Sequence, residues 1–159
     1  MKLFLDTEFT RLHRDARLIS IALVAESGEE FYVELGDGYG AEDCSEFVIS
    51  TVLPQLDSNC RCSTSEARTL LSGYLAQFSV DLEVCSDAPG WDWPFFCQLA
   101  SVGGGWPGNV QTQPTNLSDL FAYTELTADL EMLLTDPPHH ALADAKLMRD
   151  VFLHIEASQ

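Results

Sequence analysis

The stretch MKLFLDTEFT, residues 1–10, decides how the rest of the chain is interpreted. Its apolar start and its aromatic and β-branched residues predict a buried strand over residues 2–9. Two acids, Asp6 and Glu8, then follow at the end of that strand. An ionised carboxylate taken out of water without a partner is costly. The acids therefore lie either at an exposed strand end or beside a cation.

The spacing of these acids is compatible with a metal site. Side chains alternate along a strand, so Asp6 and Glu8 share a face about 6.6 Å apart, with Thr7 on the other face. Such a pair suits a hard divalent cation, which takes oxygen ligands. Because Asp-x-Glu is a common tripeptide pattern, the pair alone does not decide between the two readings.

The chain around this stretch predicts a mixed α/β domain. Apolar runs at residues 18–26 and 30–35, joined by a Ser27-Gly28 turn, predict an antiparallel meander with the first strand. A capping box at Ser63–Glu66 opens a predicted helix that runs to about residue 78. The remaining expectations are a short helix over 42–53, a strand over 82–85, a helix over 91–100, a loop over 103–114 with a short strand near Val110, and helices over 117–134 and 140–155. This order predicts one sheet in a single domain over residues 1–159.

The composition narrows the classes of partner. The net charge is −17, from 25 acids and 8 bases, so a broad basic docking face for nucleic acid is excluded. No membrane span is expected, and five cysteines without a paired framework favour reduced thiols and a cytoplasmic location. Five bases gather near the motifs, and they either pair with local acids or contact phosphate: Arg11, Arg14, Arg17, Lys146 and Arg149.

A second acidic motif lies in SDAPGWDWPFFCQL, residues 86–99. Asp92 stands at the mouth of the predicted helix between two tryptophans, where an N-cap is the ordinary structural role. Asp87 is by default a turn former. Trp91 is either part of the core or an aromatic that stacks a base.

A third motif lies in PPHHALADAKLMRD, residues 137–150. The prolines place His139 before the last helix, from where it can lie over the surface that Asp144 faces. The structural alternative is that His139 caps a turn and Asp144 pairs with Lys146 or Arg149.

Taken together, the three motifs resemble those of the DEDDh 3′–5′ exonucleases, which include ribonuclease T, oligoribonuclease and polymerase proofreading subunits. Asp6-Thr7-Glu8-Phe9 and Trp91-Asp92 look most similar to a compact exoribonuclease branch known from mycobacteria. The resemblance spans residues 3–152, with the motifs in the expected order.

The resemblance implies a ribonuclease H-like fold, with three antiparallel strands followed by parallel strands and flanking helices. It implies two Mg²⁺ or Mn²⁺ ions held by four carboxylates and a histidine general base. By position the metal ligands are Asp6, Glu8, Asp92 and Asp144, the catalytic residues are His139 and Glu8, and the substrate-binding residues are Phe9, Thr10, Arg11 and Trp91. Asp87 is a rival for the role of Asp92, and His140 for that of His139.

The implied substrate is the 3′ end of a single-stranded nucleic acid, RNA before DNA, cleaved to nucleoside 5′-monophosphates. Many relatives dimerise, so a homodimer is compatible with the resemblance. Relatives often carry threonines and a glycine where this chain has Phe9, Thr10 and Arg11, so Phe9 is expected either to wedge against the last base or to lie in the core. The alternatives are a catalytically inactive acidic interaction module on the same fold, or another metal-dependent phosphoesterase.

Overall fold

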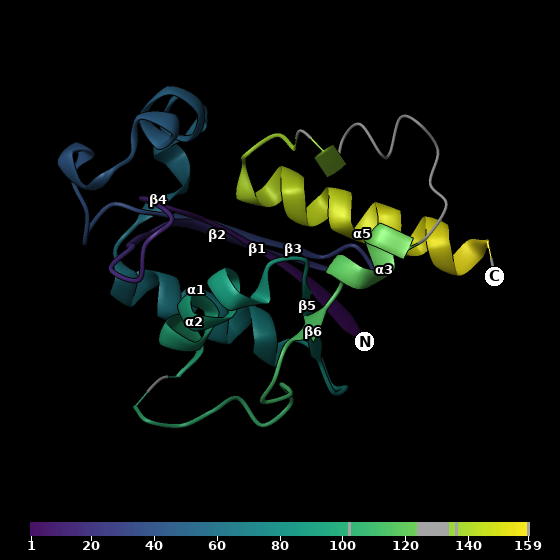
Figure 1. Cartoon of the computed structure of the whole chain (residues 1–159). Helices are drawn as coiled ribbons and strands as arrows, with labels where there is room; N and C mark the ends of the chain where they lie inside the picture. Colours follow the sequence, from purple (N-terminus) through teal and green to yellow (C-terminus); the bar gives the residue numbers. More distant parts are fainter. Residues whose placement is uncertain (102, 124–133, 136, 159) are drawn as a thin grey trace.

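A computed structural model describes residues 1–101, 103–123, 134–135 and 137–158. The described residues form a six-stranded sheet in the order β4-β3-β2-β1-β5-β6 (Figure 1). The strands are β1 (Lys2–Phe9), β2 (Leu18–Ala25), β3 (Glu30–Leu35), β4 (Arg61–Cys62), β5 (Glu83–Ser86) and β6 (Thr115–Asn116). Strands β1, β2 and β3 pair antiparallel, whereas β4, β5 and β6 each pair parallel with a neighbour. The sheet is therefore the mixed sheet expected from the sequence.

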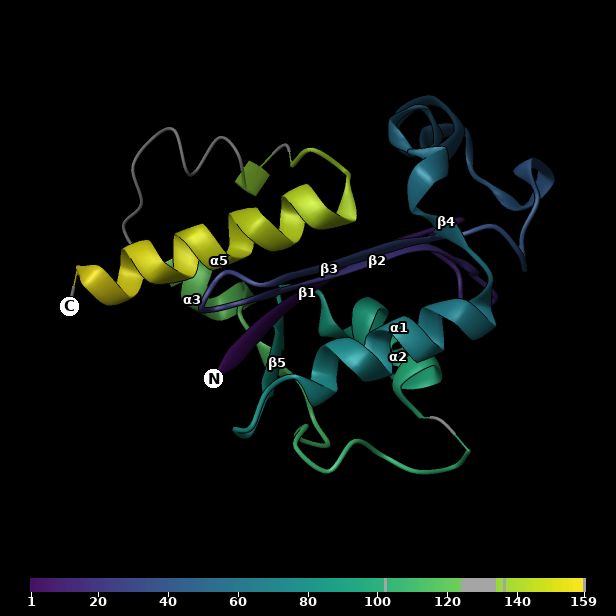
Figure 2. The same cartoon turned by 180° about the vertical axis from the view of Figure 1, so that it is seen from behind.

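Helices cover both faces of the sheet (Figures 1 and 2). One face carries α1 (Thr64–Ala76) and α2 (Pro89–Ala100), and the other carries α3 (Ser118–Tyr123) and α5 (Ala141–Ala157). Short helical turns lie between β3 and β4: η1 (Ala41–Asp43), η2 (Val48–Val52), η3 (Leu53–Gln55) and η4 (Ser58–Cys60). Among the residues described, no helix combines the length and the apolar character needed to cross a membrane.

Strand β1 contributes to the core on both of its faces. Leu3 and Leu5 are fully buried in the cluster on the α1/α2 side, and Phe4 is fully buried on the α5 side against Phe152, with ring centroids 5.4 Å apart. This alternation places Asp6 and Glu8 on the α5 side and Thr7 on the α1/α2 side. Packing of the strand thus fixes where its acids point.

The pairing of β1 with β2 contains one irregularity. Glu8 pairs with Ser20 and Phe9 pairs with Leu18, so Ile19 is an extra residue in β2. Such a bulge lets one strand carry two residues opposite one and increases the local twist. Ile19 is fully buried in a small cluster with Val48 and Val52 of η2. Through Ile19, the bulge therefore packs against η2 and joins it to the sheet.

Most predicted elements are confirmed, with ends shifted by a few residues. The helix expected over 42–53 is wrong as one element, because Cys44 is extended and the Ser45 N–H donates to the Thr10 carbonyl at 2.8 Å. The two-residue strands β4 and β6 were not expected, and Val110 forms a single bridge with Leu82. Of the helix expected over 117–134, α3 is described, and positions 124–133 lie outside the described residues.

Candidate metal centre and active site

A pocket of about 490 Å³ lies at the carboxyl end of β1 and is lined by residues from both α2 and α5. It brings together the three motifs that are distant in sequence. The acids in its wall are Asp6 and Glu8 from β1, Asp87 from the end of β5, Asp92 from α2 and Asp144 from α5. His139 lines the same pocket. All the residues predicted to hold metal or to act as the base therefore meet at one place.

One group of ligand atoms comes from Asp6, Glu8 and Asp144, whose candidate oxygens all lie within 4.8 Å of one another. Asp144 stands in the first turn of α5 and is 8% exposed. Its Oδ2 accepts the His140 backbone N–H at 2.9 Å, whereas its buried Oδ1 has no hydrogen-bond partner in the described part of the chain. A buried carboxylate oxygen without a hydrogen-bond partner is costly, and a cation bound beside it would offset that cost.

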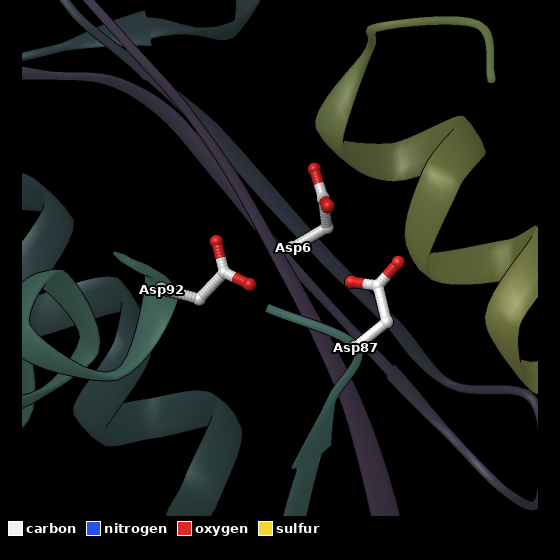
Figure 3. Close-up of side chains that lie close together, drawn as sticks. All are labelled: Asp6, Asp87 and Asp92. Atoms are coloured by element: carbon white, nitrogen blue, oxygen red, sulfur yellow. The ribbon is translucent and has the colours of Figure 1, made fainter. Parts of the chain in front are cut away.

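A second group is formed by Asp6, Asp87 and Asp92, also within 4.8 Å of one another (Figure 3). The three carboxylates converge from β1, from the chain just after β5 and from α2. Asp6 belongs to both groups. The site thus has the form of two adjacent oxygen cages that share one carboxylate.

Asp92 is held by two hydroxyl groups. Its Oδ1 accepts from Thr7 Oγ1 at 2.6 Å, and its Oδ2 accepts from Ser86 Oγ at 2.5 Å. Asp92 lies inside the first turn of α2, whose N-cap is Ala88, so it is not the N-cap that local sequence suggests. Thr7, the residue between the two acids of β1, therefore orients a third acid from the opposite face of the strand.

Burial and mutual repulsion raise the pKa values of these carboxyl groups. Desolvation is the main cause for Asp6, whose pKa is well above its ordinary value, and the charges of Asp92 and Asp144 add to it. Desolvation, followed by the same two neighbours, raises the pKa of Glu8 to about 8. Burial raises the pKa of Asp144 as well, although the His140 N–H opposes the shift.

The two remaining acids follow the same rule. Burial raises the pKa of Asp92 to about 6, although the hydroxyls of Ser86 and Thr7 stabilise its charge. Desolvation also raises the pKa of Asp87, the most exposed of the five. Such a cluster is unfavourable when ionised by itself and favourable around divalent cations. Its all-oxygen donor set fits Mg²⁺, Mn²⁺ or Ca²⁺.

His139 adopts a backbone conformation that separates it from the helix. Its φ is +56°, in the left-handed region, and α5 begins only at Ala141. The side-chain amide of Gln55 donates to the carbonyls of Pro138 and His139 at 3.0 and 3.1 Å. The His139 ring meets the ring of Phe47 edge-on, with centroids 4.8 Å apart. These contacts hold the imidazole at the pocket.

His140 has a different environment. Its ring stacks on Tyr32 at 4.9 Å, its Nδ1 is buried, and its side chain does not line the pocket. The structure thus brings His139 into the pocket. Nor does Asp144 pair with the nearby bases, since Lys146 contacts Glu30 at 2.9 Å and Arg149 contacts Asp150.

The predicted substrate-binding residues divide into two sets. Phe9 and Trp91 line the pocket and stack on each other, with centroids 5.5 Å apart, and Arg11 lines it too, 3.9 Å from Asp43. Thr10 is not in the pocket wall. It is fully buried, and its hydroxyl accepts the Arg17 N–H at 3.1 Å, closing the end of the β1–β2 hairpin.

Sequence reasoning missed two exposed apolar residues of the pocket. Leu12 and Phe47 are 75% and 50% exposed and lie in its wall. Neither belongs to a motif, and Phe47 falls within the segment expected to be a helix. Exposed large apolar side chains gathered around one pocket indicate a binding surface, but a single sequence does not show which ones gather.

Comparison with known proteins supports the fold. No family model and no curated protein matches the chain. Among solved structures, a moderately thermophilic exonuclease I from Methylocaldum szegediense superimposes with a TM-score of 0.62 at 15% identity. The match covers 99% of this chain and 40% of that one, so this chain spans less than half of the length of its structural neighbour. The likeness, together with antiparallel strands followed by parallel ones, identifies a ribonuclease H-like fold.

Proposed function

We propose that the chain is a single-domain, metal-dependent 3′–5′ exonuclease that shortens single-stranded nucleic acid and releases nucleoside 5′-monophosphates. The observation that carries the proposal is the convergence of Asp6, Glu8, Asp92, Asp144 and His139 on one pocket. Fold alone does not establish activity. The name of the structural neighbour, an exonuclease, agrees with the chemistry of the site.

In this proposal Asp6, Glu8, Asp92 and Asp144 hold two Mg²⁺ or Mn²⁺ ions. When bound, two such ions stabilise the charges on the attacking and leaving oxygens of a phosphoryl transfer and promote deprotonation of water. The protein's own part is orientation. Thr7 and Ser86 fix Asp92 through hydroxyl hydrogen bonds, and the His140 N–H fixes Asp144. Oriented carboxylates lose little freedom when they bind.

His139 is the proposed general base. As water attacks the phosphorus of the terminal phosphodiester, His139 accepts a proton from it. The bond from phosphorus to the 3′ oxygen then breaks, the 3′ oxygen takes up a proton from solvent to become the 3′-hydroxyl of the shortened strand, the 5′-monophosphate is released, and His139 returns its proton to solvent. A histidine suits this role near neutral pH. In support of this role, Gln55 binds the His139 carbonyl, Phe47 contacts the imidazole, and His139 lines the same pocket as Glu8 and Asp144.

The other pocket residues suit a single strand. Phe9 and Trp91 offer an aromatic surface for the terminal base, and the Arg11 guanidinium can pair with a phosphate. The net charge of −17 opposes a grip on a long duplex. Preference for RNA rests on the resemblance of the Asp6–Phe9 and Trp91-Asp92 stretches to the mycobacterial exoribonuclease branch.

The test uses 5′-labelled single-stranded RNA and DNA of the same sequence with Mg²⁺, Mn²⁺ or EDTA. We expect a ladder that shortens from the 3′ end, disappears with EDTA and is lost in Asp6→Ala and His139→Ala. Glu156→Gln, an exposed acid at the far end of α5, is the matched control and should remain active.

Other results would overturn the proposal. Intact strands with both metals would favour a catalytically inactive acidic module. Internal cuts, or cleavage of a strand whose 3′ end is blocked, would favour a different phosphoesterase. Faster cleavage of DNA than of RNA would refute the RNA preference and leave the exonuclease assignment in place.

A further inference from the structure

We propose that Asp87 is a fifth carboxylate ligand of this centre, so that the second cation binds to Asp6, Asp87 and Asp92 before any nucleic acid arrives. The inference rests on the proposed metal-dependent function and extends its set of four ligands. The inference also means that the substrate is not required for binding of the second cation. With three protein carboxylates in each cage, neither cation needs a phosphate oxygen in order to bind.

The register of the sheet places Asp87 beside Asp6. Strand β5 pairs parallel with β1, and Phe4 is opposite Cys85. The side chains of these two residues lie in the same core cluster, on the α5 face. Asp6 and Asp87 each lie two residues further along, after Phe4 and Cys85, and side-chain alternation therefore places them on the same face. Figure 3 shows the Asp87 side chain extending toward that of Asp6, and one carboxylate oxygen of each lies within 4.8 Å of the other.

Asp92 comes from α2, and its carboxylate has fewer free acceptor sites for a cation than that of Asp87. Both of its oxygens already accept a hydroxyl hydrogen bond, from Thr7 and from Ser86. A carboxylate oxygen offers about two acceptor sites, so each oxygen of Asp92 keeps about one for a cation. Asp87 receives no hydroxyl bond of this kind in the described structure. The backbone N–H groups of Asp87 and Ala88 partly oppose the rise that burial causes in the pKa of Asp87.

A second observation indicates that the cluster is built for cations. Asp144 Oδ1, at the other side of Asp6, is buried and has no partner among the described residues. Because Asp6 is common to both groups, the unsatisfied oxygen and Asp87 belong to one continuous set of five acids. Two divalent cations bring four positive charges, and Arg11 in the pocket wall offers a fifth.

The number of bound cations tests this inference directly. Mn²⁺ binding to the nucleic-acid-free protein is measured by electron paramagnetic resonance of the free ion and by calorimetry. We expect two Mn²⁺ per chain in the wild type. Asp87→Asn should weaken one of them by at least about 10-fold while the other is retained. Glu8→Gln should weaken the other ion instead.

Asp81→Asn, an exposed acid just before β5, is the matched control and should bind two ions. Thermal melting in EDTA checks that each variant is folded. Two ions with unchanged affinity in Asp87→Asn would overturn the role of Asp87. A single ion in the wild type, accompanied by exonuclease activity, would overturn binding before nucleic acid and leave the proposed function standing. No bound ion in the wild type would overturn both.

Discussion

The substitution Glu8→Gln should stabilise the metal-free protein in mild alkali, although it removes a proposed metal ligand. In the folded, metal-free chain the pKa of Glu8 is about 8, whereas in the unfolded chain it is 4.5. Between these values the folded state holds a proton that the unfolded state releases. Stability therefore falls as the pH rises from about 4.5 to about 8. Glutamine has nearly the same shape and does not ionise, so it removes this contribution.

The size of the effect follows from the same pKa values. A rise from 4.5 to about 8 corresponds to at most about 5 kcal/mol between the two protonation states. Part of the rise comes from the charges of Asp144 and Asp92, which lessen when those acids take up protons, so for Glu8→Gln we expect a smaller gain of about 2–3 kcal/mol. The measurement is denaturant unfolding in EDTA at about pH 5 and about pH 8.

The wild type should lose more stability between these two pH values than Glu8→Gln, and the control Glu156→Gln should behave like the wild type. Adding Mn²⁺ at the higher pH should reverse the order, because the wild type binds the ion more tightly and binding stabilises the folded state. Parallel losses of stability in wild type and Glu8→Gln in EDTA would refute the reasoning that burial raises the pKa of Glu8.

Three further substitutions test other parts of the structure. Thr7→Val removes the 2.6 Å hydrogen bond to Asp92 and should weaken Mn²⁺ binding about 10–100-fold in calorimetry, with little change in melting temperature. Trp91→Ala removes the partner of Phe9 and should weaken binding of a short single strand by about 1–3 kcal/mol in fluorescence anisotropy, with metal binding unchanged. Phe4→Ala empties a fully buried site against Phe152 and should cost about 3–5 kcal/mol in denaturant unfolding. Wild-type values in any of these measurements would contradict the contact concerned.

The parts of the fold that sequence predicts well are those whose local pattern and packing agree. Strand β1 and its neighbours β2 and β3 are apolar runs separated by strong turn signals, and the structure confirms them as an antiparallel meander. The capping box at Ser63 is also confirmed, since Ser63 and Glu66 exchange hydrogen bonds at the start of α1. In each case the decisive interactions lie within a few residues of one another.

What sequence does not show depends on register between distant segments. Asp87 looks like a turn former because its partner, Asp6, is 81 positions earlier and meets it only through the pairing of β5 with β1. From sequence alone Thr10 looks available to a substrate. In the structure it bonds to Arg17 and closes a hairpin, which the local pattern does not reveal. The helix expected over 42–53 fails for the same reason, since a long-range bond from Ser45 to Thr10 interrupts it.

The extra residue in β2 has a consequence for one wall of the pocket. Ile19 bulges toward Val48, and the pocket wall on that side is made by Val48 and the neighbouring Phe47, whose ring meets His139. This part of the pocket wall is therefore packed on an irregularity in a strand that contributes no acid. A strand that carries none of the acids thus helps to shape the pocket through packing, and motif content alone does not describe the site.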